Sequence, residues 1–335
     1  MKRYKYSTLA NVVKKFKKKK IIVMGDLLLD QFIWGEVSRI SPEAPVPVVW
    51  VKREGFMPGG ACNVASNIAR LGGEVSLVGV VGKDEKADIL KDSLTKEGIM
   101  TDGIIADEKR PTILKTRVIA HQQQVVRIDR EDVNQVSDKY HKAIQNYLKD
   151  NIRHADGVII EDYGKGLITP SLLSMVVKEA KKHGKIIAVD PKESHFSYYK
   201  GVSVITPNHH EAAKAVGFSI NSKETLIRAG EKLLKELKAN VILLTLGENG
   251  MMVFEKNRPP RKIPTLAQEV FDVSGAGDTV VAVYTLCAAG GASPILAAHI
   301  ANCAAGIVVG KVGVAIVEPK ELLNRLKRET GKGNS

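Results

Sequence analysis

The chain has 335 residues, and 44% of them are hydrophobic, which is ordinary for a globular protein. No uncharged apolar run reaches the roughly 18 residues that a membrane span needs, and the charged start, residues 1–20, has neither the apolar core nor the cleavage site of a signal peptide. Composition therefore predicts a cytoplasmic protein without a membrane partner, in which one large core carries a small appendage.

The formal net charge of +13 raises the question of a nucleic-acid partner. The main support for one is the run Lys14–Lys20, which is short and confined to a segment that we interpret as a basic N-terminal extension, residues 1–20. Because Lys and Arg elsewhere are interspersed with Asp and Glu, we predict no nucleic-acid partner, and a nucleic-acid-binding protein stays an alternative. A positive field also attracts anionic substrates such as ATP and sugar phosphates.

Short apolar runs along the chain have the length of buried strands, and helical patterns separate most of them. This alternation predicts an α/β fold with a Rossmann-like, mainly parallel sheet and helices on both faces. The predicted strands are Ile21–Gly25, Val75–Val81, Gly157–Glu161, Lys185–Asp190, Val202–Ile205 and Val241–Leu246. The predicted helices are Asn63–Leu71, Ala87–Glu97, Asp138–Lys149, Ser171–His183, Lys223–Leu237, Val280–Ala289, Ile295–Val309 and Lys320–Lys327.

Two stretches break this alternation. Residues 36–51 are rich in proline, and in residues 112–130 apolar and polar residues partly alternate. Both predict strands outside the main sheet, which we assign to a small β lid that covers a substrate and excludes water. The main domain is predicted to span residues 21–330, and residues 331–335 to form a flexible tail.

Two segments near the start carry candidate substrate-binding residues. Asp30 is the last residue of the segment that follows the first predicted strand. Ligands of open α/β sheets bind at such strand ends, and the Asp30 carboxylate can bind a pair of sugar hydroxyls. Gly59 and Gly60 allow close backbone approach to a ligand, and Asn63 can donate to and accept from hydroxyls. A surface-loop acid and an ordinary tight turn are the alternatives.

The segment Asn208-His209-His210-Glu211 follows Thr-Pro and opens a predicted helix. One face of that helix can aim Asn208 and Glu211 at Mg²⁺ and its water shell, since Mg²⁺ prefers oxygen ligands and keeps several waters. The two histidines would need a third ligand to hold zinc, and none is evident, so we interpret them as surface residues.

The segment Asp272–Thr279 combines a small-residue turn, a helix start and a carboxylate. Gly275, Ala276 and Gly277 let the backbone come close to a ligand, and N–H groups at a helix start can hold phosphate oxygens. Asp278 would then accept a hydroxyl proton as the nucleophile attacks the phosphorus atom. The segment predicts phosphoryl transfer, and the alternative is a Gly-rich turn whose Asp only stabilises the first helical turn.

Taken in order, these segments and Thr245–Gly250 resemble the motifs of the ribokinase-like carbohydrate kinases, or PfkB family, over about residues 20–327. The resemblance implies an ATP-dependent sugar kinase that uses Mg²⁺, with a monovalent cation as a further possibility, and a homodimer formed through the β lid. It implies Asp278 as the base, Gly275, Ala276 and Gly277 as an anion hole, Asn208 and Glu211 as the Mg²⁺ pair, Asp30, Gly59, Gly60 and Asn63 as sugar contacts, and Asn208, Thr245, Gly247 and Asn302 as ATP contacts.

Within that family, the block Ser38–Val49 is similar to the kinases that phosphorylate D-glycero-β-D-manno-heptose 7-phosphate at O1, a step toward ADP-heptose and the lipopolysaccharide core. Many of those kinases are fused to an adenylyltransferase domain with an HxGH motif, which this sequence lacks, so the resemblance implies a stand-alone kinase. A kinase for fructose 1-phosphate or fructose 6-phosphate, and a nonenzymatic sugar sensor, are the alternatives.

The substrate's own 7-phosphate needs cationic partners. Arg127, Lys165 and Lys192 are the candidates, because they lie in the predicted lid or near predicted strand ends. Each has the alternative of an ordinary surface charge.

Overall fold

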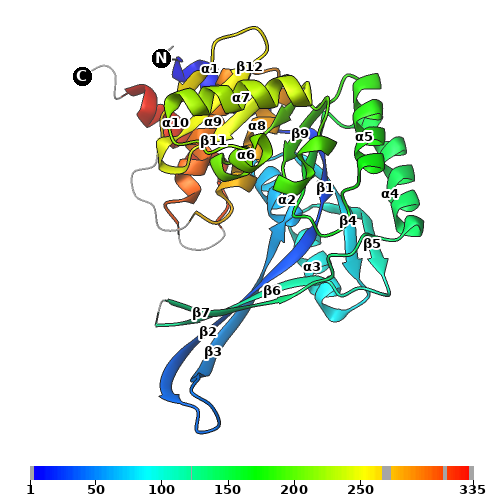
Figure 1. Ribbon diagram of the computed structural model, residues 1–335, viewed down its shortest axis with the longest axis vertical. Coiled ribbons are helices and arrows are strands. Elements are labelled where there is room, and N and C mark those ends of the chain that lie inside the picture. Colours follow the sequence, from blue (N-terminus) through cyan, green and yellow to red (C-terminus); the bar gives the residue numbers. More distant parts are fainter. Residues whose placement is uncertain (1–3, 122, 266–272, 312–314, 332–335) are drawn as a thin grey trace.

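The computed structural model describes residues 4–121, 123–265, 273–311 and 315–331 (Figure 1). Residues 332–335 of the predicted tail lie outside the described residues, as does Asp272 of the phosphoryl-transfer segment. Among the described helices, none combines the length and the apolar character that crossing a bilayer requires.

The main sheet has nine strands in the order β13-β12-β11-β10-β9-β8-β1-β4-β5. Neighbouring strands pair in parallel, except that β12 runs antiparallel to both β11 and β13. Each predicted strand is present, and β5, β12 and β13 are additional because their mixed or short sequences gave no strand pattern. The bounds are β1 Lys20–Gly25, β4 Glu74–Gly82, β5 Met100–Asp107, β8 Gly157–Glu161, β9 Ile186–Asp190, β10 Val204–Ile205, β11 Val241–Thr245, β12 Met251–Glu255 and β13 Arg261–Ile263.

Helices cover both faces of this sheet, so successive residues of a central strand such as β1 point into different cores. Val23 packs with the core beneath α8 and α9, whereas Ile22 and Met24 pack with the core beneath α4 and α5. The first face carries α1 Tyr6–Lys14, α2 Ala61–Arg70, α3 Glu85–Lys96, α8 Ala276–Ala289, α9 Pro294–Val308 and α10 Pro319–Gly331. The second carries α4 Asp138–Asn151, α5 Pro170–Lys182, α6 His209–Val216 and α7 Lys223–Leu237. Short 3₁₀ segments lie at Ile152–His154, Glu193–Tyr198 and Gly247–Asn249.

Four strands form a separate sheet in the order β3-β2-β6-β7, which we call the β lid. It projects from the main body as a long arm (Figure 1). Its bounds are β2 Leu27–Ile40, β3 Pro47–Gly60, β6 Ile113–Ala120 and β7 Gln123–Arg130. The lid begins earlier than the predicted residue 36, because the run from Leu27 onward, for which we predicted no strand, is itself a strand. Asp30 and Gly59 therefore lie in the lid, at its base.

The segment that we interpreted as a basic extension packs into the main core. Leu9 and Phe16 are fully buried in the core beneath α8 and α9, and α1 lies against α10. The lysines of Lys14–Lys20 are mostly exposed around these apolar anchors. The boundary drawn at residue 20 therefore does not mark a change in packing.

This packing predicts that Phe16→Ala lowers the free energy of unfolding by about 3–5 kcal/mol, because removing a buried ring leaves a cavity. Denaturant unfolding followed by circular dichroism measures the change. Lys17→Ala, at an exposed neighbouring position, is the control and should change the same free energy by less than about 0.5 kcal/mol. Equal, small effects of both substitutions would show that the segment is a detachable extension.

Candidate active site

The carboxyl ends of β1, β8, β9 and β11 lie along one edge of the main sheet, because these strands are parallel. In open α/β sheets ligands bind at this edge. The start of α8, the base of the β lid and the start of α6 reach the same edge, so most of the predicted site residues converge there. The site is therefore assembled from segments far apart in the sequence.

The first turn of α8 has the form that the sequence predicted for an anion-binding helix start. Gly275 adopts a left-handed φ of 75°, which favours glycine. The backbone N–H and the hydroxyl of Thr279 both donate to the Gly275 carbonyl, at 3.0 and 2.9 Å. The helix beyond is almost wholly buried, so its position is fixed by packing. Its N-terminal N–H groups and partial positive charge face the carboxyl edge.

Asp278 in this turn is buried and is held from two sides. The Asn63 amide donates to Asp278 Oδ2 at 2.6 Å, and the Tyr163 hydroxyl lies 3.5 Å from Oδ1. Burial raises the pKa of Asp278 to about 6; the hydrogen bond from Asn63 lowers this pKa and the nearby Asp30 carboxylate raises it. A carboxyl group with a pKa near neutrality is suited to accept and release a proton.

Asn63, predicted to contact a sugar, donates from its side-chain amide to Asp278. Its own Oδ1 lies 3.4 Å from Asn67 Nδ2, and Asn67 Oδ1 accepts from the Thr279 hydroxyl at 3.3 Å. This buried network ties α2 to α8. Asn63 therefore fixes the orientation of the Asp278 carboxylate, a function that sequence reasoning missed because the partners are 215 residues apart.

Asp30 lies at the base of the β lid, close enough to Asp278 to affect its pKa. Its carboxylate pairs with the guanidinium of Arg117 on β6. A Cβ added to Gly59 would approach Asp30 Oδ2 to 2.3 Å, and one on Gly60, which has a φ of 56°, would approach the Asp26 carbonyl to 2.8 Å. Both glycines are thus required for close packing around the site, and Arg117 is a cationic site residue that the sequence analysis did not identify.

Asp26 organises the loop that follows β8. Its Oδ2 accepts from the backbone N–H groups of Tyr163 and Lys165 at 2.9 and 3.0 Å. Burial, together with the Asp162 carboxylate, raises the pKa of Asp26 to about 6. These bonds place the Tyr163 ring beside Asp278.

The three cations proposed for a substrate phosphate are not brought together as one group. Arg127 is exposed on β7 and bonds Asp129 at 2.9 and 3.1 Å, and Lys165 pairs with Glu131 at 2.6 Å. Lys192 lies near the start of α6, where its charge acts on Glu211.

Asn208 and Glu211 form a capping box at the start of α6. Asn208 Oδ1 accepts from the Glu211 N–H at 3.0 Å, and Glu211 Oε2 accepts from the Asn208 N–H at 2.9 Å. The pair is therefore held rigidly at the carboxyl edge, and burial raises the pKa of Glu211. One carboxylate oxygen of Glu211 and the amide N–H₂ of Asn208 are not used by the box.

The predicted ATP contacts lie beside this helix start. Asn208 and Thr245 form a parallel bridge, which joins the start of α6 to the end of β11. Gly247 follows with a φ of 58° and is exposed. Asn302 in α9 donates to the Pro264 carbonyl at 2.8 Å, so its amide holds the segment after β13.

Two acids that the sequence analysis did not single out, the buried Glu161 and the partly buried Asp190, complete the site. Glu161 and Asp190 end β8 and β9 and are direct register partners, so their side chains share the face beneath α8. One carboxylate oxygen of each lies within 4.8 Å of one on Asp278 and of each other. The sequence feature that could have identified Glu161 and Asp190 is an acid at the last position of each of two predicted buried strands.

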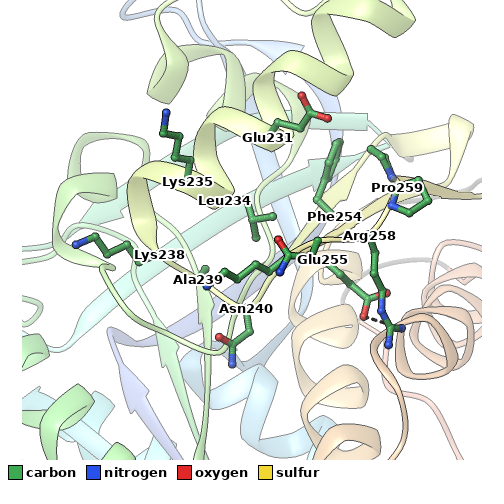
Figure 2. Close-up of a pocket in the computed structure, with 13 residues that line it drawn as sticks. Glu231, Leu234, Lys235, Lys238, Ala239, Asn240, Phe254, Glu255, Arg258 and Pro259 are labelled. Atoms are coloured by element: carbon green, nitrogen blue, oxygen red, sulfur yellow. Dashed lines mark ion pairs between the residues drawn. The ribbon is translucent and has the colours of Figure 1, made fainter.

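A cavity of about 840 Å³ lies elsewhere, between the end of α7 and the turn after β12 (Figure 2). It is at the opposite edge of the sheet, because Asn240 precedes β11 and Glu255 ends the antiparallel β12. Lys235 and Lys238 extend in different directions, and Arg258 pairs with Glu255 at 3.5 Å (Figure 2). None of the predicted site residues lines this cavity.

Comparisons with known proteins agree with the resemblance read from the motifs. The chain is 47% identical over 308 residues to "Bifunctional protein HldE" of Desulfatibacillum aliphaticivorans, covering 92% of this chain and 63% of that protein. It is 45% identical over 314 residues to the protein of the same name from Geobacter sulfurreducens, covering 94% and 64%. The chain therefore spans less than two thirds of the length of these relatives.

Solved structures show the same fold at low identity. Arabidopsis thaliana ribokinase complexed with ribose and ATP matches with a TM-score of 0.73 and 21% identity, covering 92% of this chain and 99% of that one. Escherichia coli phosphofructokinase-2 in a tetrameric inhibited form matches with a TM-score of 0.77 and 17% identity, covering 93% and 99%. The predicted Rossmann-like sheet with a β lid is confirmed.

The family model for the pfkB family carbohydrate kinases matches residues 18–321. The match includes the α8 turn with Asp278, the α6 start and the base of the β lid. The chain belongs to the pfkB family of carbohydrate kinases.

Proposed function

We propose that this chain transfers the γ-phosphoryl group of ATP to O1 of D-glycero-β-D-manno-heptose 7-phosphate, giving the 1,7-bisphosphate. The observation that most supports phosphoryl transfer is the buried Asp278 at the N-terminus of α8, with its pKa raised to about 6. The choice of sugar is supported by the Ser38–Val49 block and by relatives at 45–47% identity. A reaction that uses ATP and a sugar phosphate belongs in the cytoplasm.

In the proposed step, the O1 hydroxyl oxygen attacks the γ-phosphorus atom as the bond from that atom to the bridging oxygen of ADP breaks. Asp278 accepts the hydroxyl proton, while Asn63 holds the carboxylate in place. The N–H groups of the Gly275–Gly277 turn stabilise charge on the transferred phosphoryl oxygens. Because a carboxylate is a weak base toward an alcohol, positioning and charge stabilisation supply most of the acceleration.

ATP is proposed to lie along the carboxyl edge, contacted by Asn208, Thr245, Gly247 and Asn302. Mg²⁺ supplies charge neutralisation to the phosphates. Asn208 and Glu211 would hold it through water: Glu211 keeps one carboxylate oxygen free to accept from a Mg²⁺-bound water, and Asn208 would hold Glu211 in place through the capping box. A monovalent cation stays a possible additional cofactor.

The sugar is proposed to contact Asp30 and the Gly59–Gly60 turn. Its 7-phosphate is proposed to bind cations of the β lid, because Arg127 lies directly across from Arg117 in the β6–β7 register and shares its face of the lid. Each already pairs with a carboxylate, Arg117 with Asp30 and Arg127 with Asp129, so the proposed phosphate would be a further anion on a face that carries two guanidinium groups. Lys165 and Lys192 stay candidates for the same role.

A homodimer through the β lid is also part of the proposal. Trp50 is 67% exposed and Ile128 is 56% exposed, and Val51 and Val126 add further exposed apolar surface on the lid strands. Exposed apolar strands of this kind are suited to pair with the same surface on a second copy of the chain.

Asp278→Asn should lower turnover by a factor of about 100 or more, because the carboxamide cannot accept the hydroxyl proton. The measurement is ATP consumption with a panel that contains heptose 7-phosphate, fructose 1-phosphate and fructose 6-phosphate. ATP binding by the variant, measured by calorimetry, should be preserved. Near-normal turnover of the variant would remove Asp278 as the base, and preference for a fructose phosphate would replace the proposed substrate.

Asn63→Ala should move the acid limb of the pH–rate profile upward by about one to two pH units. The Asn63 amide stabilises the charged form of Asp278, so losing this bond raises the pKa of the carboxyl and the base stays protonated to higher pH. The profile is measured for wild type and variant at the same Mg²⁺ concentration. Ser66→Ala, a buried change in the same helix at an unpartnered hydroxyl, is the control. A lower rate without any shift of the limb would reduce Asn63 to a packing residue.

Arg127→Ala should raise the KM for heptose 7-phosphate about tenfold or more and leave the KM for ATP nearly unchanged, because a charge-assisted bond to phosphate is lost. The effect should disappear when unphosphorylated heptose is the acceptor. Arg130→Ala, on the opposite face of the same strand, is the matched control. A similar rise in both KM values would argue against a contact between Arg127 and the substrate phosphate.

A further inference from the structure

Arg110 lies in residues 108–112, the segment that enters the β lid at β6. Its Nη2 donates to the backbone carbonyls of Asp132 and Asn134 at 3.0 and 2.9 Å. Both carbonyls belong to residues 131–136, which lead from β7 to α4 and which we call the exit segment. A guanidinium suits this position, because its N–H donors lie in one rigid plane. Arg110 therefore joins the two ends of the β6–β7 hairpin where they meet the main body.

The exit segment packs on the loop that follows β8, residues 162–166, which we call the active-site loop. The Val136 N–H donates to the Gly166 carbonyl at 3.0 Å. Gly166 has a φ of 87°, and a Cβ there would collide with the Asn134 carbonyl, so this close approach requires glycine. The same guanidinium reaches the Lys165 carbonyl, which lies 3.4 Å from Nη2. One side chain thus contacts both segments, and we call these contacts the Arg110 clamp.

Glu131 makes a second link between the same two segments. Its Oε1 accepts from Lys165 Nζ at 2.6 Å, and its Oε2 accepts from Nζ of Lys115 on β6 at 3.3 Å. The three side chains are 13–19% exposed, so these ion pairs are better shielded from water than ordinary surface pairs. Glu131 joins side chains, whereas the Arg110 clamp holds the backbone itself.

The active-site loop carries Tyr163 to the candidate base. Asp26, which follows β1, holds the loop by accepting from the N–H groups of Tyr163 and Lys165 at 2.9 and 3.0 Å. The Tyr163 hydroxyl then lies 3.5 Å from Asp278 Oδ1. Hydrogen bonds between a hydroxyl and an oxygen usually span at most about 3.0 Å. A small displacement of the active-site loop therefore decides whether this bond forms.

The segment that carries Arg110 is itself fixed to the main body. Thr112 is 1% exposed, and its N–H and hydroxyl donate to the two oxygens of the Asp84 carboxylate at 2.8 and 2.7 Å. Asp84 also caps α3, and the Gly82 N–H at the end of β4 donates to the Thr112 hydroxyl at 3.0 Å. Arg110 therefore reaches the exit segment and the active-site loop from an anchored position.

We propose that Arg110 is a positioning residue for the base of the proposed reaction. By holding the exit segment against the active-site loop, it keeps the Tyr163 hydroxyl within hydrogen-bond reach of Asp278. The kinetic part of this inference rests on the proposed function, whereas the clamp itself does not. Because the clamp lies at the base of the β6–β7 hairpin, a change in the position of the β lid would be passed on to Tyr163.

Loss of the guanidinium should loosen the active-site loop without unfolding the chain. Arg110 is partly exposed, so water can replace it at the three carbonyls and the global fold is kept. A displacement of about 1 Å at a catalytic contact can lower a rate by about 100-fold. We expect a smaller effect, about tenfold, because Asp26 still holds the loop from the side of β1.

The first test is hydrogen–deuterium exchange of the full chain without ATP or sugar, followed by mass spectrometry. In Arg110→Ala, peptides that cover the exit segment and the active-site loop should exchange about tenfold faster than in wild type, because their amides open more often. Lys109→Ala removes the neighbouring exposed cation and should leave both exchange rates unchanged. Wild-type exchange of the active-site loop in Arg110→Ala would overturn the proposal.

Steady-state kinetics with heptose 7-phosphate measures the consequence at the base. Arg110→Ala should lower kcat about tenfold and change the KM for ATP by less than about twofold. The reason is that the three carbonyls held by Arg110 belong neither to the α8 turn nor to the residues proposed to contact ATP. Lys109→Ala should keep the wild-type kcat. A KM for ATP that rises as much as kcat falls would contradict the positioning role.

A double-mutant cycle tests whether Arg110 acts through Tyr163. Tyr163→Phe removes the hydroxyl beside Asp278 and should itself lower kcat. In that background Arg110→Ala should lower kcat by less than about twofold more, since the contact that it maintains is already lost. Effects of the two substitutions that multiply would overturn the proposal. If Arg110→Ala does not fold, Arg110→Lys, which keeps the charge but not the planar donor group, takes its place in all three measurements with the same expected directions.

These outcomes separate the inference from the proposed function. A chain whose active-site loop exchanges faster in Arg110→Ala, but which phosphorylates none of the sugar phosphates, would refute the proposed function and support the clamp. A chain that phosphorylates heptose 7-phosphate, with loop exchange unchanged in Arg110→Ala, would do the reverse.

Discussion

Burial of the Asp278 carboxyl at the first turn of α8 is the constraint on which the candidate site depends. A solvated aspartate would be too weak a base and too mobile to act at one atom. Here the buried body of α8 fixes the helix, and the Asn63 amide donates to the carboxylate at 2.6 Å. The same burial that raises the pKa of Asp278 also makes any unpaired charge beside it costly.

Local patterns were sufficient to predict the main architecture. The apolar runs of β1, β8, β9 and β11 are short and continuous because both of their faces are covered, and that pattern is visible without any structure. The lid was predicted only in part. Its middle was recognised because the sequence there is irregular, whereas the start of β2 was missed because it reads Leu-Leu-Leu-Asp and resembles the end of the preceding strand. The division between β1 and β2 is set by the change of sheet at Asp26, which is a tertiary effect.

The candidate site could be predicted where a single segment contains the reacting residues. It could not be predicted where the residues are brought together only by the register of paired strands. The α8 turn holds its glycines and Asp278 within a few positions, so it could be recognised. Glu161 and Asp190 meet only because β8 and β9 are neighbours in a particular register. Likewise Arg117 is one basic residue among many until β6 places it against Asp30.

The acids of the sheet edge illustrate a conflict between stability and chemistry. Packing alone would favour apolar side chains where β8 and β9 end, since the positions before them, Ile160 and Val189, are fully buried. Carboxyl groups at these positions instead concentrate negative charge beneath a helix N-terminus, whose partial positive charge offsets only a small part of it. Such local departures from consistent packing are expected where a ligand completes the charge balance. Burial and mutual repulsion raise the pKa values of Glu161 and Asp190 well above their ordinary range, so these carboxyl groups lower the cost of their burial by holding protons.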